Sequence, residues 1–264
     1  MKGSTRTSDA GVSESIGYIM ISGILITSFI LISTVGYPIF NAYIDEGHMK
    51  NVQESFDILA YNGNNVAMHN LPYASSEIKM YGGTLATRDT GYINISYYSD
   101  NAGTMPNILG FDNRTLTVLE YTKNTNRVAY VDGGVYALWN DGSTMIREPE
   151  IYSNGETFVY NEVPLMYSYV FISGNGPVQL TFSTPYYSKM SQSVYSVGAK
   201  SITGVHHIRI TISGDYAEAI GNYMQQQFGF AKHQGSDGEL ILSKAFPGGI
   251  KLCIVPDYLV IENK

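Results

Sequence analysis

The apolar and polar positions divide the chain into an N-terminal helical part and a longer part with the alternation of strands. Residues 16–37 carry no charge and lie in an uncharged window that covers residues 15–44. About 20 apolar residues in a helix cross a hydrocarbon core of roughly 30 Å. The pattern predicts a membrane-spanning helix, because helices of soluble proteins seldom run this long without a charge.

A cleaved secretory signal peptide fits this segment less well. The apolar core of such a peptide has about 7–15 residues and ends in an Ala-x-Ala-like site. Here Pro38 and then NAYIDE (residues 41–46) follow the apolar run. Small residues interrupt its surface, and in lipid such residues let helices pack closely; they are Gly17, Ser22, Gly23, Thr27, Ser28, Ser33, Thr34 and Gly36.

A helical pattern continues beyond Pro38, where we expect a kink because proline lacks a backbone N–H. Apolar residues recur at spacings near three or four through Val52, Phe56 and Leu59, with polar residues between them. This predicts an amphipathic stalk, and with the apolar run it covers residues 10–61. NGNN (residues 62–65) is expected to end the helix, because Gly and Asn accept left-handed backbone angles. The apolar stripe is either a surface that packs on a head domain or the first core helix of an anchored domain.

Residues 62–190 have the alternation of β-strands. Asp132-Gly133-Gly134 and Asn140-Asp141-Gly142 predict tight hairpin connections. A β-sandwich or Greek-key head is the expected result. Polar residues alternate with β-branched or aromatic residues in short stretches, at residues 77–81, 91–98, 115–121, 127–131, 134–139, 157–160, 165–172 and 178–182.

Residues 199–264 are expected to form a small α+β module after a linker-like stretch at residues 191–198. A strand over residues 206–212 precedes a helix that Asp215 and Glu218 open as a capping box and Gly229 closes. Strands are predicted at residues 239–245, 250–255 and 258–261. The predicted fold class is α+β: a leader-like segment at residues 1–9, a long hydrophobic helix, a β-rich head and this module.

Charge limits the location and the partners of the chain. The formal net charge is −7, which argues against a nucleic-acid partner, since that would need a basic face. Lys2 and Arg6 precede the apolar run, whereas Asp45 and Glu46 follow it. The positive-inside rule therefore predicts a single-pass protein with its N-terminus inside the cell and its bulk outside. The single cysteine, Cys253, cannot form a disulfide within the chain.

No motif in the chain predicts catalysis, a cofactor or a bound metal. The adjacent His206 and His207 lie in a predicted strand, where neighbouring side chains point to opposite faces. A Gly-x-Ser-x-Gly elbow and a phosphate-binding loop are both missing from the sequence. We therefore do not predict an enzyme.

Two features of the β-rich part point to surface chemistry. Asn94-Ile-Ser96 and Asn113-Arg-Thr115 are acceptor sequons for N-glycosylation. Tyrosine is abundant, and sheet packing explains most of its positions. Some tyrosines are also candidates for a carbohydrate- or subunit-facing surface, because the ring offers area and the hydroxyl a hydrogen bond; these are Tyr97, Tyr98, Tyr167, Tyr169, Tyr186 and Tyr187.

The N-terminal motif carries a family resemblance. DAGVSESIGYIM (residues 9–20) resembles the N-terminus of archaeal type IV pilin-like proteins, the group related to archaellins. In that group a short basic leader precedes the motif (A/G)-V-S-x-x-I-G and a long hydrophobic helix. The resemblance is close over residues 9–40. ESFDIL (residues 54–59) and GGTL (residues 82–85) are similar to stretches of archaeal envelope proteins that carry this N-terminus.

The resemblance implies that a prepilin-type peptidase removes the leader on the cytoplasmic side, with Asp9, Ala10 and Gly11 at the processing site. The family's usual Lys/Arg-Gly or Arg-Ala junction is missing, and Asp9 stands before Ala10. Cleavage after Asp9 would make Glu14 the fifth mature residue, where bacterial pilins have a functional glutamate. Cleavage after Gly11 would make it the third, and the comparison would lapse.

Glu14 has two interpretations. A carboxylate at the edge of the hydrocarbon is costly to bury unless it meets a positive partner, such as the new amino terminus of a neighbouring subunit. Alternatively, Glu14 is an acid in the first turn of a helix that Ser13 caps, where the helix dipole favours a negative charge.

The sequence leads to two functional hypotheses. In the first, the chain is a pilin-like structural subunit, major or minor, of an archaeal surface filament. Its partners are then membrane lipid before assembly and like subunits afterwards. In the second, it is an uncleaved single-pass envelope protein whose ectodomain binds a partner or a glycan.

Overall fold

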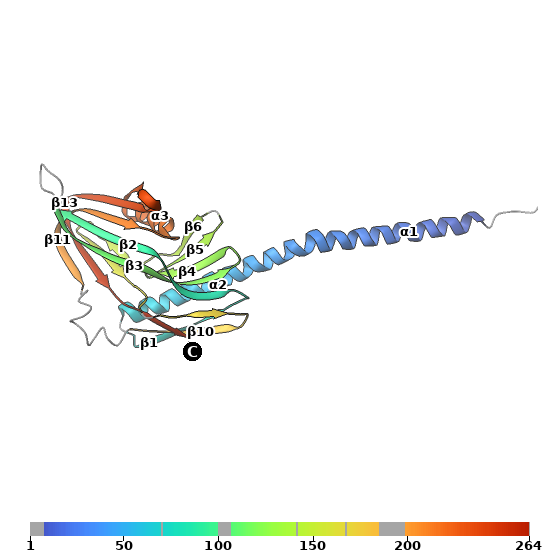
Figure 1. Ribbon diagram of the computed structural model, residues 1–264, viewed down its shortest axis with the longest axis horizontal. Coiled ribbons are helices and arrows are strands. Elements are labelled where there is room, and N and C mark those ends of the chain that lie inside the picture. The colour runs from blue at the N-terminus through green and yellow to red at the C-terminus, as the bar shows by residue number, and fades with distance from the viewer. Residues whose placement is uncertain are drawn as a thin grey trace, which may run out of the picture. The chain divides into compact units, whose positions relative to one another are not determined.

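The computed structural model describes residues 8–69, 71–99, 107–140, 142–166, 168–184 and 199–263. The chain divides into two compact units, Met1–Lys50 and Asn51–Lys264. A long apolar helix lies in the first unit, and strands dominate the second (Figure 1). This confirms the predicted α+β class.

The first unit is helical throughout its described residues. α1 (Ser8–Leu31) leads into a π-helical turn, η1 (Ile32–Gly36), and then into α2 (Tyr37–Met68). Pro38 is the second residue of α2, directly after the π turn, and the backbone N–H of Tyr37 donates to Ile32 O. A proline ring clashes with the carbonyl four residues before it, and a wider turn relieves that clash. The irregularity expected at Pro38 is therefore a π turn inside a continuing helix.

α2 ends at Met68, so the prediction that NGNN would end the helix near residue 61 was wrong. A Cβ on Gly63 would lie 3.0 Å from Leu259 Cδ2, which shows how closely the helix packs there. Asn64 Nδ2 donates to Gly133 O at 2.8 Å, and Asn64 Oδ1 accepts from the Tyr130 hydroxyl at 2.9 Å. Gly63 and Asn64 have a local preference to end a helix, but here they remain helical and contact other elements of the fold.

The second unit is built on a curled sheet, in which the described residues contribute eleven strands. Their order is β6-β5-β4-β3-β2-β11-β13-β8-β7, with β9 beside β2 and β12 beside β13. Neighbours are antiparallel except β13 and β8, which are parallel. The strands are β2 (Thr84–Ser99), β3 (Asn107–Lys123), β4 (Asn126–Val131), β5 (Gly134–Trp139), β6 (Gly142–Arg147), β7 (Ile151–Ser153), β8 (Thr157–Glu162), β9 (Phe171–Ser173), β11 (Lys200–Ile212), β12 (Ala231–Gln234) and β13 (Leu240–Pro256).

A smaller sheet has the order β1 (Tyr73–Lys79), β10 (Pro177–Ser183) and β14 (Val260–Asn263), all antiparallel. Within the second unit the last part of α2 lies between the two sheets, because Gly63 is close to Phe182 of β10 and to Tyr130 of β4 (Figure 1). On this part of α2, Val52, Phe56 and Leu59 are buried. The helix thus occupies the layer that the opposing sheet would fill in the expected sandwich.

α3 (Ala217–Phe228) packs against β6, β12 and β13 beside the concave face of the curled sheet. Its Ile220, Tyr223 and Met224 join the core formed by inward residues of the long strands. Gly229 caps its C-terminus in the left-handed conformation, as predicted. The predicted capping box was wrong: Tyr216 is the N-cap, with no side-chain cap bond, and the Asp215 carboxylate instead binds two arginines.

The C-terminal residues share this sheet with the earlier ones. β11 pairs with both β2 and β13, and β13 pairs with β8. Two adjacent strands of residues 199–264, β11 and β13, therefore lie between β2 and β8 of residues 62–190. The linker-like stretch at residues 191–198 lies outside the described residues. The strands predicted at residues 239–245 and 250–255 form the single strand β13.

The predicted hairpins are observed. Asp132 and Gly133 have φ of 50° and 85° between β4 and β5, as a two-residue hairpin turn requires. β5 and β6 pair from Trp139 and Gly142 onward. Asp141, within the second predicted turn, lies outside the described residues.

Candidate functional site

The apolar helix surface of the first unit is the most distinctive feature of the described chain. One helix is long and apolar enough to span a membrane, with a mean hydropathy of 2.2 over its best window and none of that window buried. Large apolar side chains such as Ile19 (71% exposed) and Phe29 (72% exposed) have no cover from the described chain. A core helix of a soluble protein would bury such residues, because exposed apolar area is unfavourable in water.

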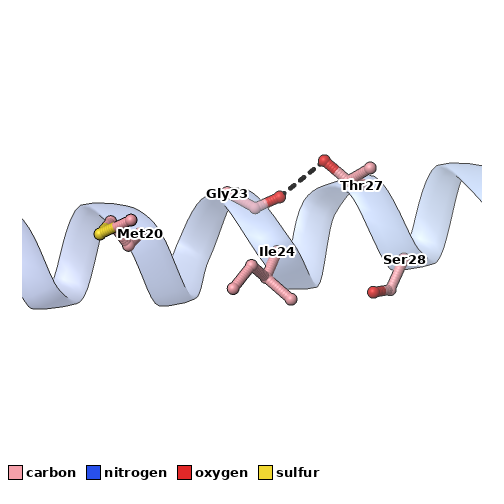
Figure 2. Close-up of a pocket in the computed structure, with 5 residues that line it drawn as sticks. All are labelled: Met20, Gly23, Ile24, Thr27 and Ser28. Carbon is pink, nitrogen blue, oxygen red and sulfur yellow. Dashed lines mark hydrogen bonds between the residues drawn. The ribbon is translucent and has the colours of Figure 1, made fainter.

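Two threonine hydroxyl groups on this surface are hydrogen-bonded within the helix. Thr27 Oγ1 donates to Gly23 O at 2.8 Å, as Figure 2 shows, and Thr34 Oγ1 donates to Ile30 O at 2.7 Å. In hydrocarbon no water is present to bond these groups, so a partner one turn back removes the cost of burying them.

A shallow groove of about 330 Å³ runs along the helix surface (Figure 2). It is lined by Met20, Gly23, Ile24, Thr27 and Ser28. A Cβ on Gly23 would meet no atom of the described chain within 4 Å, so contacts within the chain do not require glycine there. A helix surface with small side chains such as these lets a neighbouring helix approach closely in lipid.

The predicted processing residues lie at the start of α1. The helix begins at Ser8, so Asp9, Ala10 and Gly11 are in its first turn. Glu14 lies farther along the helix, and Ser13 is inside it, so the interpretation of Ser13 as the N-cap was wrong. The side chains of these residues lie outside the described part of the structure, as do Lys2 and Arg6.

The two sequons are brought together by the sheet. Asn94 of β2 and Asn113 of β3 are directly opposite each other in the antiparallel pair. Asn113 is exposed, whereas Asn94 is half-buried and its Oδ1 accepts from Ser96 Oγ at 2.9 Å.

A buried charge cluster, which sequence reasoning missed, joins β3, the β4–β5 turn and β8. Arg114 Nη2 binds Asp132 Oδ2, and Arg114 Nε lies 3.0 Å from Glu162 Oε1. The Asp132 carboxylate also accepts from the Tyr160 hydroxyl at 2.9 Å and from Val163 N at 2.7 Å. The β4–β5 turn therefore places the Asp132 carboxylate where it accepts hydrogen bonds from the other groups of the cluster.

Burial raises the pKa of Glu162 to about 7. The Arg114 guanidinium opposes this rise, and the nearby Asp132 and Asp112 carboxylates add to it. Glu162 Oε1 lies beside Arg114 Nε and Asp112 Oδ2 lies 3.3 Å from Lys200 Nζ, but neither contact has hydrogen-bond geometry. The loss of hydration on burial therefore raises the pKa of Glu162 more than the neighbouring Arg114 cation lowers it.

A second charge cluster fixes the start of α3 to the curled sheet. Arg88 donates to both carboxylate oxygens of Glu120, at 2.9 and 2.6 Å, and to Asp215 at 2.8 Å. Arg127 donates to the same Asp215 oxygen at 2.7 Å, and the Tyr216 hydroxyl donates to Glu120. The Arg88 bonds keep the pKa of the Asp215 carboxyl below its usual range.

The sequence profile of a family of unknown function, DUF7289, matches residues 11–258. The chain belongs to DUF7289. The matched residues include both the apolar helix and the curled sheet, so one family covers both units. No curated protein matches the chain.

The tyrosines considered for a surface role differ in their exposure in this DUF7289 member. Tyr97 is buried in the core, and Tyr98 lies under the Arg209 guanidinium, 5.9 Å from its ring centre. Tyr169 is 89% exposed. Tyr167, Tyr186 and Tyr187 lie outside the described residues.

The acidic and histidine side chains of the DUF7289 chain do not gather into a metal site in the part that the structure describes. There, no group of three or more His, Cys, Asp or Glu side chains is placed to hold an ion. The acids that do come together are bound by arginine instead: Asp132 and Glu162 by Arg114, and Glu120 and Asp215 by Arg88.

Proposed function

We propose that this chain is a membrane-anchored, pilin-like structural subunit of an archaeal surface filament. The observation that carries the proposal is the wholly exposed apolar helix of membrane-spanning length near the N-terminus. It supports an anchor in lipid before assembly and a packing surface among like helices afterwards.

The chemistry of the helix surface supports movement between these two environments. Lipid tails and the Ile, Leu and Phe side chains of neighbouring helices are similarly apolar, so transfer costs little for the exposed apolar area. The Thr27 and Thr34 hydroxyls keep their partners inside the helix in either environment. The groove at Gly23, where no side chain projects, is a place where a second helix can approach closely.

The N-terminal motif accounts for the transfer of the subunit from the membrane to the filament. A prepilin-type peptidase acting at Asp9, Ala10 or Gly11 on the cytoplasmic side would release the leader and create a new amino terminus. Glu14 would then pair with the amino terminus of a neighbouring subunit, which offsets the cost of a carboxylate at the edge of the hydrocarbon. The second unit lies outside the cell in this arrangement.

N-terminal mass spectrometry tests the proposal. The full-length chain is expressed in an archaeal host, and both membranes and material sheared from the cells are collected. We expect the surface material to lack either nine or eleven N-terminal residues. Surface material that retains Met1 would contradict the proposal.

Variants at the motif test its role. We expect Gly11→Val and Glu14→Gln to reduce processing or the amount of sheared filament, while Glu46→Gln, an acid beyond the apolar window, leaves both unchanged. The full chain is required, because a fragment that begins at residue 62 would lack Val52, Phe56 and Leu59 of the core. Normal filaments from both motif variants would remove the basis of the pilin comparison.

A second candidate is an uncleaved single-pass envelope protein whose outer unit binds a partner or glycan. It is favoured by the exposed aromatic rings of Tyr169 (89%) and Phe171 (79%) in the second unit. An intact N-terminus in the membrane fraction, together with sheared material that lacks the chain, would support this candidate over the first.

A further inference from the structure

A polar groove of about 290 Å³ lies on the second unit, where β2 and β3 meet the segment before β9. Residues of three chain segments line it. They are Thr87, Arg88 and Asp89 of β2, Thr117 of β3, and Leu165, Ser168 and Tyr169.

The wall that carries Tyr169 is firmly attached to the sheet. Thr87 N donates to Val170 O at 2.9 Å, and Thr87 Oγ1 accepts from Val170 N at 3.0 Å while donating to Ser168 O at 2.8 Å. Ser168 Oγ accepts from Ile261 N of β14 at 2.8 Å. The residues on both sides of Tyr169 are thus anchored, so its ring is displayed from a fixed backbone.

The Tyr169 ring is displayed to solvent. Its side chain is 89% exposed, and no hydrogen bond or ring contact holds it in the described structure. Ser168 and Val170 are buried, whereas Tyr169 and Phe171 (79% exposed, the first residue of β9) are not, which is the alternation of an extended segment whose alternate side chains point to one side. Two large rings displayed side by side on an anchored segment are a surface that a ligand can cover.

Asp89 supplies a fixed acceptor in the same groove. Its Oδ1 accepts from Thr117 Oγ1 at 2.7 Å, and its other oxygen has no hydrogen bond among the residues that the structure describes. The carboxylate is solvent-exposed on the face shared with Thr117. An ionised carboxylate accepts at both oxygens, so one remains available for a donor from outside the chain.

We propose that this groove binds a neutral saccharide. One sugar ring stacks its C–H face on Tyr169, and a hydroxyl of that sugar donates to the free oxygen of Asp89. A second ring of an oligosaccharide covers Phe171. A ligand of this kind has both an apolar face and several hydroxyl donors, which is the combination that the groove presents.

The charges around the groove select against acidic ligands. Arg88 contributes to its lining, but its guanidinium is already bonded to Glu120 and Asp215. Asp89 and the formal net charge of −7 repel phosphates and acidic sugars. The inference goes beyond the structural role of the first candidate above and gives the second candidate its ligand class and its residues. It holds whether or not the leader is cleaved.

Direct binding to defined sugars tests the inference. The full chain is purified in a detergent without a sugar headgroup and titrated with neutral oligosaccharides of glucose, mannose, galactose and N-acetylglucosamine, and with oligogalacturonate as the acidic probe. We expect saturable binding to at least one neutral probe and weaker binding to the acidic one. No saturable binding to any neutral probe, or tighter binding to oligogalacturonate, would overturn the proposal.

Two variants locate the site. Tyr169→Ala and Asp89→Asn should each weaken binding by about tenfold or more, since each removes a direct contact. Tyr73→Ala is the matched control, because Tyr73 is an exposed tyrosine (67%) on β1 of the smaller sheet. Its binding should equal that of the wild type, and all three variants should keep the wild-type unfolding midpoint. Wild-type affinity in both groove variants would show that any binding occurs elsewhere and would reject this site.

Discussion

Gly63 of α2 lies against Leu259, so close that a Cβ on residue 63 would come within 3.0 Å of Leu259 Cδ2. Phe182 Cδ1 would be 3.6 Å away. The glycine therefore permits the close approach of α2 to the smaller sheet. Its neighbour Asn64 binds the curled sheet instead, through Gly133 and Tyr130.

Gly63→Val should destabilise the chain by about 1–3 kcal/mol, because a branched side chain forces Leu259 or Phe182 to move in a packed core. Gly47→Val is the matched control in the same helix, since a Cβ there meets nothing within 4 Å. Urea unfolding of both variants in detergent micelles, followed by circular dichroism, measures the difference. Equal stability of the two variants would show that the contact at residue 63 is not tight.

The free energy of unfolding should depend on the protonation of Glu162. Its pKa in the folded chain is about 7, against an ordinary value of 4.5. The folded state therefore binds more protons than the unfolded state between these values, so the contribution of this group is fully present below about pH 4.5. It is lost as the pH rises through 7.

Glu162→Gln isolates this effect from the other titrating groups. The wild type should lose stability relative to the variant between pH 5 and pH 8, because only the wild type acquires a buried charge there. Urea unfolding of both proteins at four pH values in this range gives the difference directly. A difference that does not change with pH would mean that Glu162 is already charged throughout.

N-glycosylation, if the host modifies the chain, should occur at Asn113 and not at Asn94. Asn94 lies in β2 with paired residues on both sides, Asn113 and Thr211, and is half-buried. Asn113 is exposed, and β4 pairs with β3 only from residue 119 onward. In the archaeal host, Asn113→Gln should remove the glycan mass from the intact protein, and Asn94→Gln should leave it in place. Loss of the glycan mass from Asn94→Gln alone would reverse this assignment.

The features that the sequence predicts correctly depend on neighbours in the chain. The apolar run is recognisable because membrane-spanning length is a property of consecutive residues. The turn at Asp132 and Gly133 and the cap at Gly229 need positive φ, which the local residue types permit. Each of these signals acts within a few residues of its own position.

The features that the sequence does not reveal depend on contacts between distant residues. Asp215 has the local pattern of a capping residue, but Arg88 and Arg127 of β2 and β4 bind its carboxylate. Arg114 meets Glu162 only because the sheet curls, and the spacing of the two residues in the chain gives no sign of this. The exposure of Tyr169 likewise follows from the anchoring of its neighbours by Thr87. Alternation predicts where strands lie but not which strands pair.

Membrane association should depend on the apolar window and not on the later part of the same helical run. Ile24 (65% exposed) lies within the window, and Ile58 (59% exposed) lies in the part of α2 that belongs to the second unit. A lysine near the centre of a spanning helix costs about 2.5–3.5 kcal/mol of insertion free energy. Ile24→Lys should therefore shift the chain from the membrane pellet into the soluble fraction after alkaline carbonate extraction. Ile58→Lys places the same charge on an equally exposed helical site outside the window, so its pellet fraction should equal that of the wild type. Full retention of Ile24→Lys in the pellet would mean that another part of the chain holds the protein in the membrane.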